Sequence, residues 1–167
     1  VVRPPAILVD YGLVEATTLW KLTRVLYGLR SGPKLWTVYR DIEMNKMRVM
    51  DGEKELRMVP VKDTIGIFRI LDGDQLMGVV LAYVDDILIL ADTHIVEAVI
   101  RAFEGKWKCK VTGIIDVQDQ NNFGSKTTEV VIERVKRITF LGICVEREEG
   151  QWALHQKGYW AANLERR

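Results

Sequence analysis

The stretch LMGVVLAYVDDILIL at residues 76–90 decides the fold, because two apolar runs flank the adjacent aspartates Asp85 and Asp86. Apolar runs of this length, separated by a short polar break, are typical of buried strands. The stretch therefore predicts an antiparallel hairpin with Val84, Asp85 and Asp86 at its tip. Neighbouring carboxylates repel each other, and a divalent cation removes this cost while leaving coordination positions for phosphate oxygens. The alternative is an exposed turn that binds nothing, in which an Asp-Asp pair is also common.

The chain on either side of this hairpin predicts one more strand and one helix. Residues 65–71 form a β-like run, and Asp72-Gly73 predicts the tight turn that leads into the hairpin. The polar residues 52–63 are interpreted as a connection. Between Ile95 and Phe103 apolar residues recur with helical spacing, so we expect a helix there.

The most polarised segment is residues 19–40, in which five basic and no acidic side chains are interleaved with aromatic ones. Ser31 and Pro33 suit the first turn of a helix. That helix would carry an apolar stripe made of Leu35, Val38, Tyr39 and Ile42. Helical spacing favours a place in the core, rather than stacking on bases, for Trp36, Tyr39 and Phe103.

The C-terminal third predicts further strands. Residues 106–111 alternate lysine with apolar residues, which predicts a strand whose three ammonium groups either follow a phosphate backbone or form a solvated face. Residues 116–128 are polar and predict a loop. Two more strands are expected at residues 137–146 and 152–155, and a helix is expected to start near residue 159.

The composition bounds the fold class. A chain of 167 residues that is 48% hydrophobic suits one globular domain. Strands and helices that mix without strict alternation predict an α+β fold, with an antiparallel sheet and helices packed on one face. The 24 basic and 23 acidic residues give a net charge of +1, which neither indicates nor excludes a nucleic-acid binder.

Cysteine, histidine and hydropathy patterns suggest no further site. Cys109 and Cys144 lie far apart without metal-binding spacing, so we expect reduced, buried thiols and neither a zinc site nor a disulfide framework. His94 and His155 stand alone, and no role is assigned to them. Because no signal peptide is recognisable and no apolar run reaches about 20 residues, we expect a soluble intracellular protein without membrane insertion.

Four short motifs follow one another along the chain: LYGLRSGPKLW at residues 26–36, YVDD at 83–86, TFLGICVE at 139–146 and LHQKGY at 154–159. In this order they resemble the LYGLKQSPRAW, YVDD, FLGIEI and LSQ-x-x-Y elements of the reverse transcriptases encoded by copia-type LTR retrotransposons. Any one of these motifs is weak by itself, whereas four in the same order are a specific signal.

The resemblance implies RNA-directed DNA synthesis by two-metal nucleotidyl transfer, with an RNA template, a DNA primer and a deoxynucleoside triphosphate. It implies that Asp85 and Asp86 are catalytic and hold two Mg²⁺ or Mn²⁺ ions, and that Tyr83 lies against the primer end. It also implies contacts with the substrate or nucleic acid for Gly28, Arg30, Pro33, Lys34, Phe140 and Gly142.

The resemblance also implies a reverse-transcriptase-like palm with truncated fingers and thumb. Residues 1–63 would form the fingers and palm edge, and residues 64–137 the palm with the YVDD hairpin. A primer-grip-like hairpin would follow at residues 138–157, and the thumb would begin at residues 158–167.

One departure from the family pattern bears on activity. Family members carry a further aspartate in a DVKTAFL-like strand, and the chain shows no equivalent, since Asp10 stands in another context. We therefore expect the chain by itself to be inactive. The alternative is a retroelement-derived structural or interaction subunit, in which a protein partner covers the truncated sheet edge.

Overall fold

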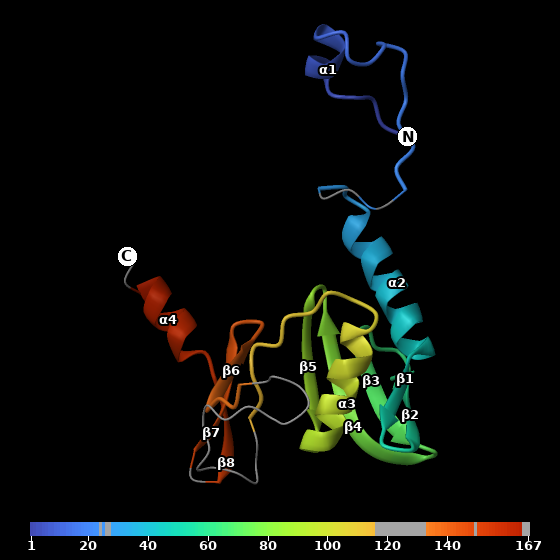
Figure 1. Cartoon of the computed structure of the whole chain (residues 1–167). Helices are drawn as coiled ribbons and strands as arrows, with labels where there is room; N and C mark the ends of the chain where they lie inside the picture. Colours follow the sequence, from blue (N-terminus) through green and yellow to red (C-terminus); the bar gives the residue numbers. More distant parts are fainter. Residues whose placement is uncertain (24, 26–27, 116–132, 149, 165–167) are drawn as a thin grey trace. The chain divides into compact units, whose positions relative to one another are not determined.

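The computed structural model describes residues 1–23, 25, 28–115, 133–148 and 150–164. The chain divides into two compact units, Val1–Ile42 and Glu43–Arg167. The fold is α+β with antiparallel sheets and a few helices, as the sequence predicts (Figure 1). Within the described residues, no helix is both long and apolar enough to cross a membrane. The division into fingers, palm and thumb stays a prediction.

The first unit holds the short helix α1 (Ala6–Asp10) and most of α2 (Gly32–Lys46). The predicted apolar stripe of α2 is exposed, and the core position expected for Tyr39 is wrong, since 47% of this residue is accessible. The buried side chains of α2 are instead Arg40 and Met44. These two residues are four apart and share a helix face, so the stripe around Ile42 points the other way.

The second unit is built on a five-stranded antiparallel meander. Its strands follow the chain order and are β1 (Arg48–Asp51), β2 (Lys54–Pro60), β3 (Ile67–Asp72), β4 (Gln75–Tyr83) and β5 (Asp86–Ala91). The prediction of a polar connection at residues 52–63 is wrong, because β2 occupies most of it. In β2 the buried Leu56 and Met58 alternate with exposed charged residues, as in a strand with one solvent-exposed face.

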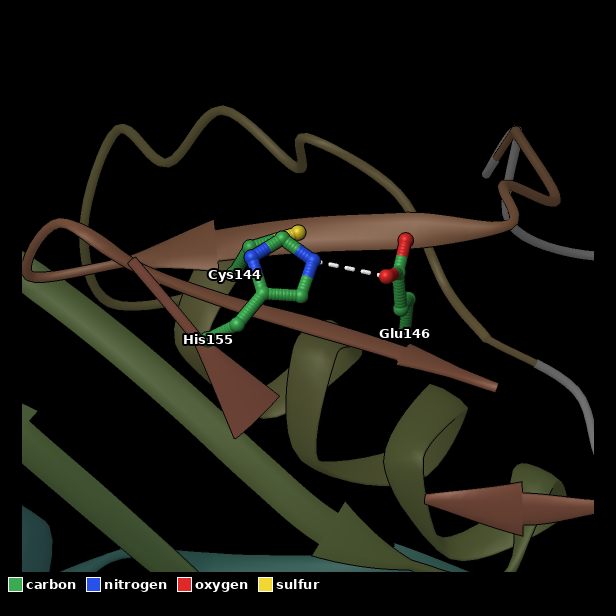
Figure 2. A group of neighbouring side chains, drawn as sticks. All are labelled: Cys144, Glu146 and His155. Carbon is green, nitrogen blue, oxygen red and sulfur yellow. Dashed lines mark hydrogen bonds and ion pairs between the residues drawn. The ribbon is translucent and has the colours of Figure 1, made fainter. Parts of the chain in front are cut away.

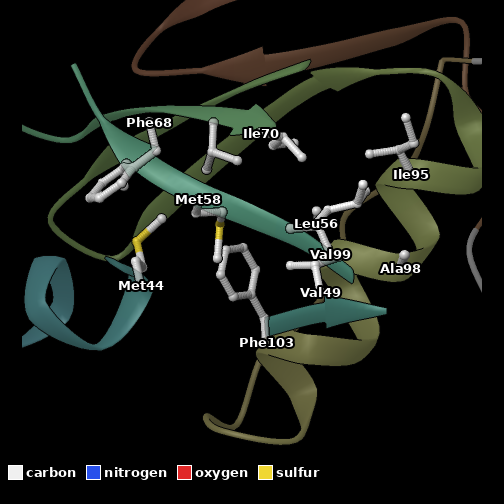
Figure 3. Packing of buried hydrophobic residues seen from close by; sticks show 12 residues of the cluster. Met44, Val49, Leu56, Met58, Phe68, Ile70, Ile95, Ala98, Val99 and Phe103 are labelled. Atoms are coloured by element: carbon white, nitrogen blue, oxygen red, sulfur yellow. The ribbon is translucent and has the colours of Figure 1, made fainter. Parts of the chain in front are cut away.

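Helix α3 (Thr93–Glu104) lies against one face of this sheet and closes the core (Figure 3). Alternate residues of β1 to β4 point toward it. The buried cluster consists of Met44, Val49, Leu56, Met58, Phe68, Ile70, Val80, Ala82, Ile95, Ala98, Val99 and Phe103. The intervening residues of the strands point to the opposite face, where Met50, Arg57, Arg69 and Leu90 are exposed.

A separate three-stranded antiparallel sheet consists of β6 (Arg137–Phe140), β7 (Ile143–Glu148) and β8 (Gln151–His155), and the helix α4 (Lys157–Leu164) follows it. The prediction of one continuous strand at residues 137–146 is wrong. Leu141 and Gly142 have left-handed φ values of 51° and 78°, so the chain reverses between β6 and β7. The helix predicted near residue 159 is confirmed.

The strand predicted at residues 106–111 is wrong as well. The backbone N–H groups of Lys106 and Trp107 donate to the carbonyl oxygen of Phe103, so this segment begins as a turn that ends α3. The ring of Trp107 packs on that of Phe103, with centroids 5.7 Å apart. Turn geometry and this aromatic contact therefore explain the segment better than strand alternation does. The loop predicted at residues 116–128 lies outside the described residues.

Candidate functional site

The two aspartates lie at the tip of the β4–β5 hairpin, as the sequence predicts. Tyr83 and Asp86 form the last cross-strand pair, and Val84 and Asp85 make the two-residue turn between them. Val84 has a φ of 47°, which is a left-handed conformation that a β-branched residue rarely adopts. Such a conformation costs about 1–3 kcal/mol, and strained residues cluster at functional sites.

Both carboxylates at this tip are presented to solvent. Asp85 and Asp86 are exposed, and no hydrogen bond or ion pair of either side chain is found within the part of the chain that the structure describes. Two adjacent negative charges without a cationic neighbour repel each other. Their oxygen atoms are the hard ligands that Mg²⁺ and Mn²⁺ prefer. The donor types therefore fit such an ion.

Asp86 shares a sheet face with two basic side chains. It is paired with Tyr83, whereas the next pair along the hairpin, Ala82 and Ile87, points into the core. Because side chains alternate along a strand, Tyr83 and Asp86 belong to the face that α3 leaves uncovered. Arg57 and Arg69 are exposed on the same face. The sheet therefore has carboxylates at one end and Arg69 nearer its middle, whereas the Arg57 guanidinium donates to the carbonyl oxygen of Gly73 at the opposite end.

A third ligand is not found beside the pair. In residues 1–23, 25, 28–115, 133–148 and 150–164, no other histidine, cysteine or acidic side chain joins Asp85 and Asp86 in a potential metal-binding group. Among the described residues, strand β5, which begins with Asp86, pairs with β4 alone and forms an edge of its sheet. An edge strand can accept another strand by backbone hydrogen bonding.

The residues predicted to contact nucleotide and template lie in the first unit. Gly28, Arg30, Pro33 and Lys34 are all exposed. Gly28 has a left-handed φ of 90°, as the turn before a helix requires, and Pro33 is in the first turn of α2, as predicted. The substrate contacts of these four residues stay predictions.

The other predicted hairpin residues are where the sequence places them. Phe140 ends β6, pairs with Ile143 and is half-buried, and Gly142 lies in the turn that follows. Strands β6 and β7 therefore form a hairpin. Its role in holding a primer stays a prediction.

Sequence reasoning missed one group of potential metal ligands. Cys144, Glu146 and His155 offer a sulfur, an oxygen and a nitrogen atom that lie within 4.8 Å of one another. The expectation of buried thiols is wrong for Cys109, which is exposed, and Cys144 is half-buried. The signal that could have revealed the group is the antiparallel pairing of two short strands across a Glu-Gly turn, which places residues far apart in sequence side by side.

Comparison with protein-family models, with curated proteins and with solved structures finds no match to this chain.

Proposed function

We propose that this chain is the palm-centred part of a copia-type reverse transcriptase, an RNA-directed DNA polymerase that works inside the cell. The observation that carries the proposal is the pair of exposed aspartates on a strained two-residue turn at the tip of an antiparallel hairpin. The left-handed position of a two-residue hairpin turn favours glycine or asparagine, so the turn itself does not require a valine there. Nor does it require two carboxylates that have no partner among the described residues. A polymerase that positions metal ions beside a primer end needs both an exposed tip and a rigid one.

Asp85 and Asp86 would hold the two divalent ions, with Asp85 the more important ligand. When bound, such ions polarise the phosphate of the nucleotide and activate the primer 3′-hydroxyl. The contribution of the chain itself is to fix both carboxylates on the hairpin. Tyr83, which is 60% exposed beside Asp86, would lie against the terminal primer base.

The uncovered face of the five-stranded sheet would receive the primer and template. Arg57 and Arg69 lie on this face and can neutralise backbone phosphates. Contacts of this kind position a nucleic acid without reading its sequence. A polymerase that copies any template needs this kind of contact.

The edge position of β5 is the place for a third carboxylate. Two metal ions carry four positive charges, and Asp85 and Asp86 offset at most two of them. A strand that pairs with β5 would bring its side chains next to the hairpin tip. We propose that an aspartate from such a strand completes the site in the active polymerase.

The first experiment measures metal binding without requiring activity. Mn²⁺ broadens NMR signals of nearby nuclei, so at low Mn²⁺ concentration the amide signals of Val84 to Ile87 should broaden first. Asp85→Asn should abolish this selectivity, whereas Asp74→Asn, at the opposite end of β4, should leave it intact. Equal broadening at both ends of β4 would contradict the proposed site.

The second experiment tests polymerisation. Primer extension on an RNA template would compare the 167-residue chain with the same chain joined to a DVKTAFL-like strand. The chain alone should show background activity, since misplacing reacting groups by about 1 Å costs on the order of a hundredfold in rate. Robust extension by the chain alone would show that a first aspartate has been overlooked, and inactivity of both proteins would favour the second candidate below.

The second candidate function is that of an interaction subunit without catalysis. The observation that favours it is the exposed apolar stripe of α2, formed by Leu35, Val38, Tyr39 and Ile42. Contiguous apolar surface of this kind is common at protein interfaces. Sedimentation of the wild-type chain and of Val38→Lys would test it, because a partner bound through this stripe should dissociate in the variant.

A further inference from the structure

The three-stranded sheet carries a group of potential metal ligands that is chemically unlike the aspartate pair. Cys144 and Glu146 are two residues apart on β7 and point to the same face. His155 on β8 lies directly opposite Cys144 in the strand register. The potential ligand atoms of all three lie within 4.8 Å of one another, and all three residues are half-buried (Figure 2).

A hydrogen bond already holds two of these side chains together. The Nε2 atom of His155 lies 2.6 Å from Oε1 of Glu146, and the two side chains are only 22% and 16% exposed. On the other side of the ring, the backbone N–H of Lys157 donates to Nδ1 over 3.3 Å. Because Nδ1 accepts, the ring proton sits on Nε2 and is donated to Glu146. The imidazole is therefore oriented before any ion arrives.

We propose that Cys144, Glu146 and His155 bind a single Zn²⁺ ion. Thiolate sulfur, imidazole nitrogen and carboxylate oxygen are the three ligand types of protein zinc sites, and three such ligands leave the fourth position to water. The sulfur and nitrogen atoms disfavour Mg²⁺ and Ca²⁺, which take oxygen ligands. This inference is independent of the proposed polymerase, since it involves neither Asp85 nor Asp86.

The geometry needs only small side-chain movements. In a tetrahedral site with bonds of about 2.0–2.3 Å, ligand atoms lie roughly 3.3–3.8 Å apart. The Nε2 and Oε1 atoms, now 2.6 Å apart, must separate slightly, and atoms as far apart as 4.8 Å must approach. Rotations about the χ angles can supply both changes while β7 and β8 keep their register.

Binding of Zn²⁺ moves one proton on His155 and releases the thiol proton of Cys144. The ion takes the place of the proton between Nε2 and Oε1, and that proton moves to Nδ1, where it replaces the long contact from Lys157. The thiol of Cys144 releases its proton to solvent. Release of the thiol proton is the usual coupling of metal binding to deprotonation.

A neighbouring cation tunes the affinity of this group. Arg137 on β6 is the cross-strand partner of Glu146, and side chains opposite each other across a ladder lie about 5 Å apart at Cβ. Its positive charge opposes the arrival of a divalent cation. Arg137→Gln should therefore tighten zinc binding several-fold, whereas loss of any of the three ligands should weaken it.

The chain supplies its own controls for the test, because it contains two cysteines and two histidines. Cys109 and His94 lie outside the group. Cys109 is exposed, and desolvation of part of its side chain, followed by the charge of Glu104, raises the pKa of its thiol. Cys109→Ser and His94→Ala should therefore leave metal binding unchanged.

The experiment is a titration of the reduced protein with Co²⁺, followed by competition with Zn²⁺. Wild type should bind one Co²⁺ and develop the near-ultraviolet absorption of a cobalt–thiolate bond, which Zn²⁺ then removes. Cys144→Ser should bind Co²⁺ without this band. His155→Ala and Glu146→Gln should each lower the affinity for Co²⁺ by about tenfold to a hundredfold. Zn²⁺ should raise the thermal midpoint of wild type and of the two control variants more than that of the three ligand variants.

Several outcomes would overturn the proposal. One is a thiolate band that persists in Cys144→Ser or disappears in Cys109→Ser, since either places the ion at the other cysteine. Another is absence of cobalt binding to wild-type protein whose circular dichroism shows a folded chain. Unaltered affinity in a folded Glu146→Gln variant, whose side chain can still accept the hydrogen bond from His155, would remove the carboxylate from the ligand set.

Discussion

A two-residue turn adjoins each end of β4, and the two turns differ in their left-handed residue and in the partners of the nearby carboxylates. At the β3–β4 end a glycine, Gly73, takes the left-handed conformation with a φ of 57°, while at the β4–β5 end Val84 takes it with a φ of 47°. Near Gly73, the Asp72 carboxylate is paired with Lys54 over 3.2 Å. Near Val84, no basic partner of either aspartate is found among the described residues.

This difference shows what folding alone requires of a tight turn. Glycine in the left-handed position and a cation beside the carboxylate are the arrangements that cost least. The β4–β5 turn departs from both, although it closes the same strand. We propose that binding accounts for this departure, and the four predictions below test that contrast.

If the proposed function holds, the largest effect comes from exchanging one aspartate for asparagine in the chain joined to the DVKTAFL-like strand. Asp85→Asn should lower nucleotide incorporation by on the order of a thousandfold, because a ligand charge that stabilises the transition state is lost while the shape is kept. Asp74→Asn, in the turn at the other end of β4, should have no effect. Single-turnover primer extension measures both, and equal activities would remove the functional distinction between the two turns.

The second effect concerns the layer that supports both turns. Phe68 on β3 lies opposite Val80 of β4 and is 1% exposed. Phe68→Ala should therefore lower the free energy of unfolding by about 3–5 kcal/mol through lost burial and a cavity. The neighbouring Arg69, on the uncovered face, is the matched control, and Arg69→Ala should change stability by no more than about 0.5 kcal/mol. Urea denaturation followed by tryptophan fluorescence gives both values, and similar losses would mean that both faces of the sheet are packed.

The residues around these turns also show how far sequence reasoning reaches. The hairpin tip, the Asp72-Gly73 turn and α3 were predictable, because each depends on local signals: apolar runs, turn residues and helical periodicity. Strand β2 was predictable in principle from the alternation of Leu56 and Met58 with charged residues, but its polar composition suggested a connection.

Two other features depend on tertiary pairing and could not be read locally. The segment after α3 alternates like a strand, yet Trp107 packs on Phe103 and no partner strand is formed within the described residues. The Cys144, Glu146 and His155 group arises only once β7 and β8 are paired in one particular register, and spacing rules for metal motifs do not cover such cases. A shift by one residue would separate the donors onto opposite faces.

The third prediction exchanges the residues in the left-handed positions. Val84→Gly should stabilise the chain by about 1 kcal/mol, because relief of backbone strain exceeds the added entropy of the unfolded glycine. Gly73→Val should destabilise it by about 1–3 kcal/mol because of the left-handed backbone conformation. Steric overlap is not the cause, since no atom lies within 4 Å of a Cβ placed at Gly73. Urea midpoints of the two variants measure the contrast directly. If Val84→Gly destabilised the chain, the strain assigned to this turn would be absent.

The smallest effect concerns an ion pair between α2 and the segment that follows α3, whose contribution to stability depends on pH. Glu43 on α2 pairs with Lys106, just after α3, and lies 3.7 Å from Lys46. The hydrogen bond from Lys106 is the main cause that lowers the pKa of the Glu43 carboxyl below its ordinary value of 4.5. A carboxyl whose pKa is lowered by folding stabilises the folded state when it is ionised.

The sign of the pH dependence follows from this direction. The contribution of Glu43 is complete above the unfolded pKa of 4.5 and is lost as the pH falls through the lower pKa of the folded state. Glu43→Gln cannot titrate, so the urea midpoints of wild type and variant should differ near neutral pH and converge in acid. Because the pair is accessible to water, the difference should also shrink with added salt.

Lys106→Gln should produce the same pattern, and the double variant should add little to either single change, because each one already removes the same interaction. A difference that stays constant from neutral to acidic pH would mean that Glu43 stabilises the chain through packing and not through its charge.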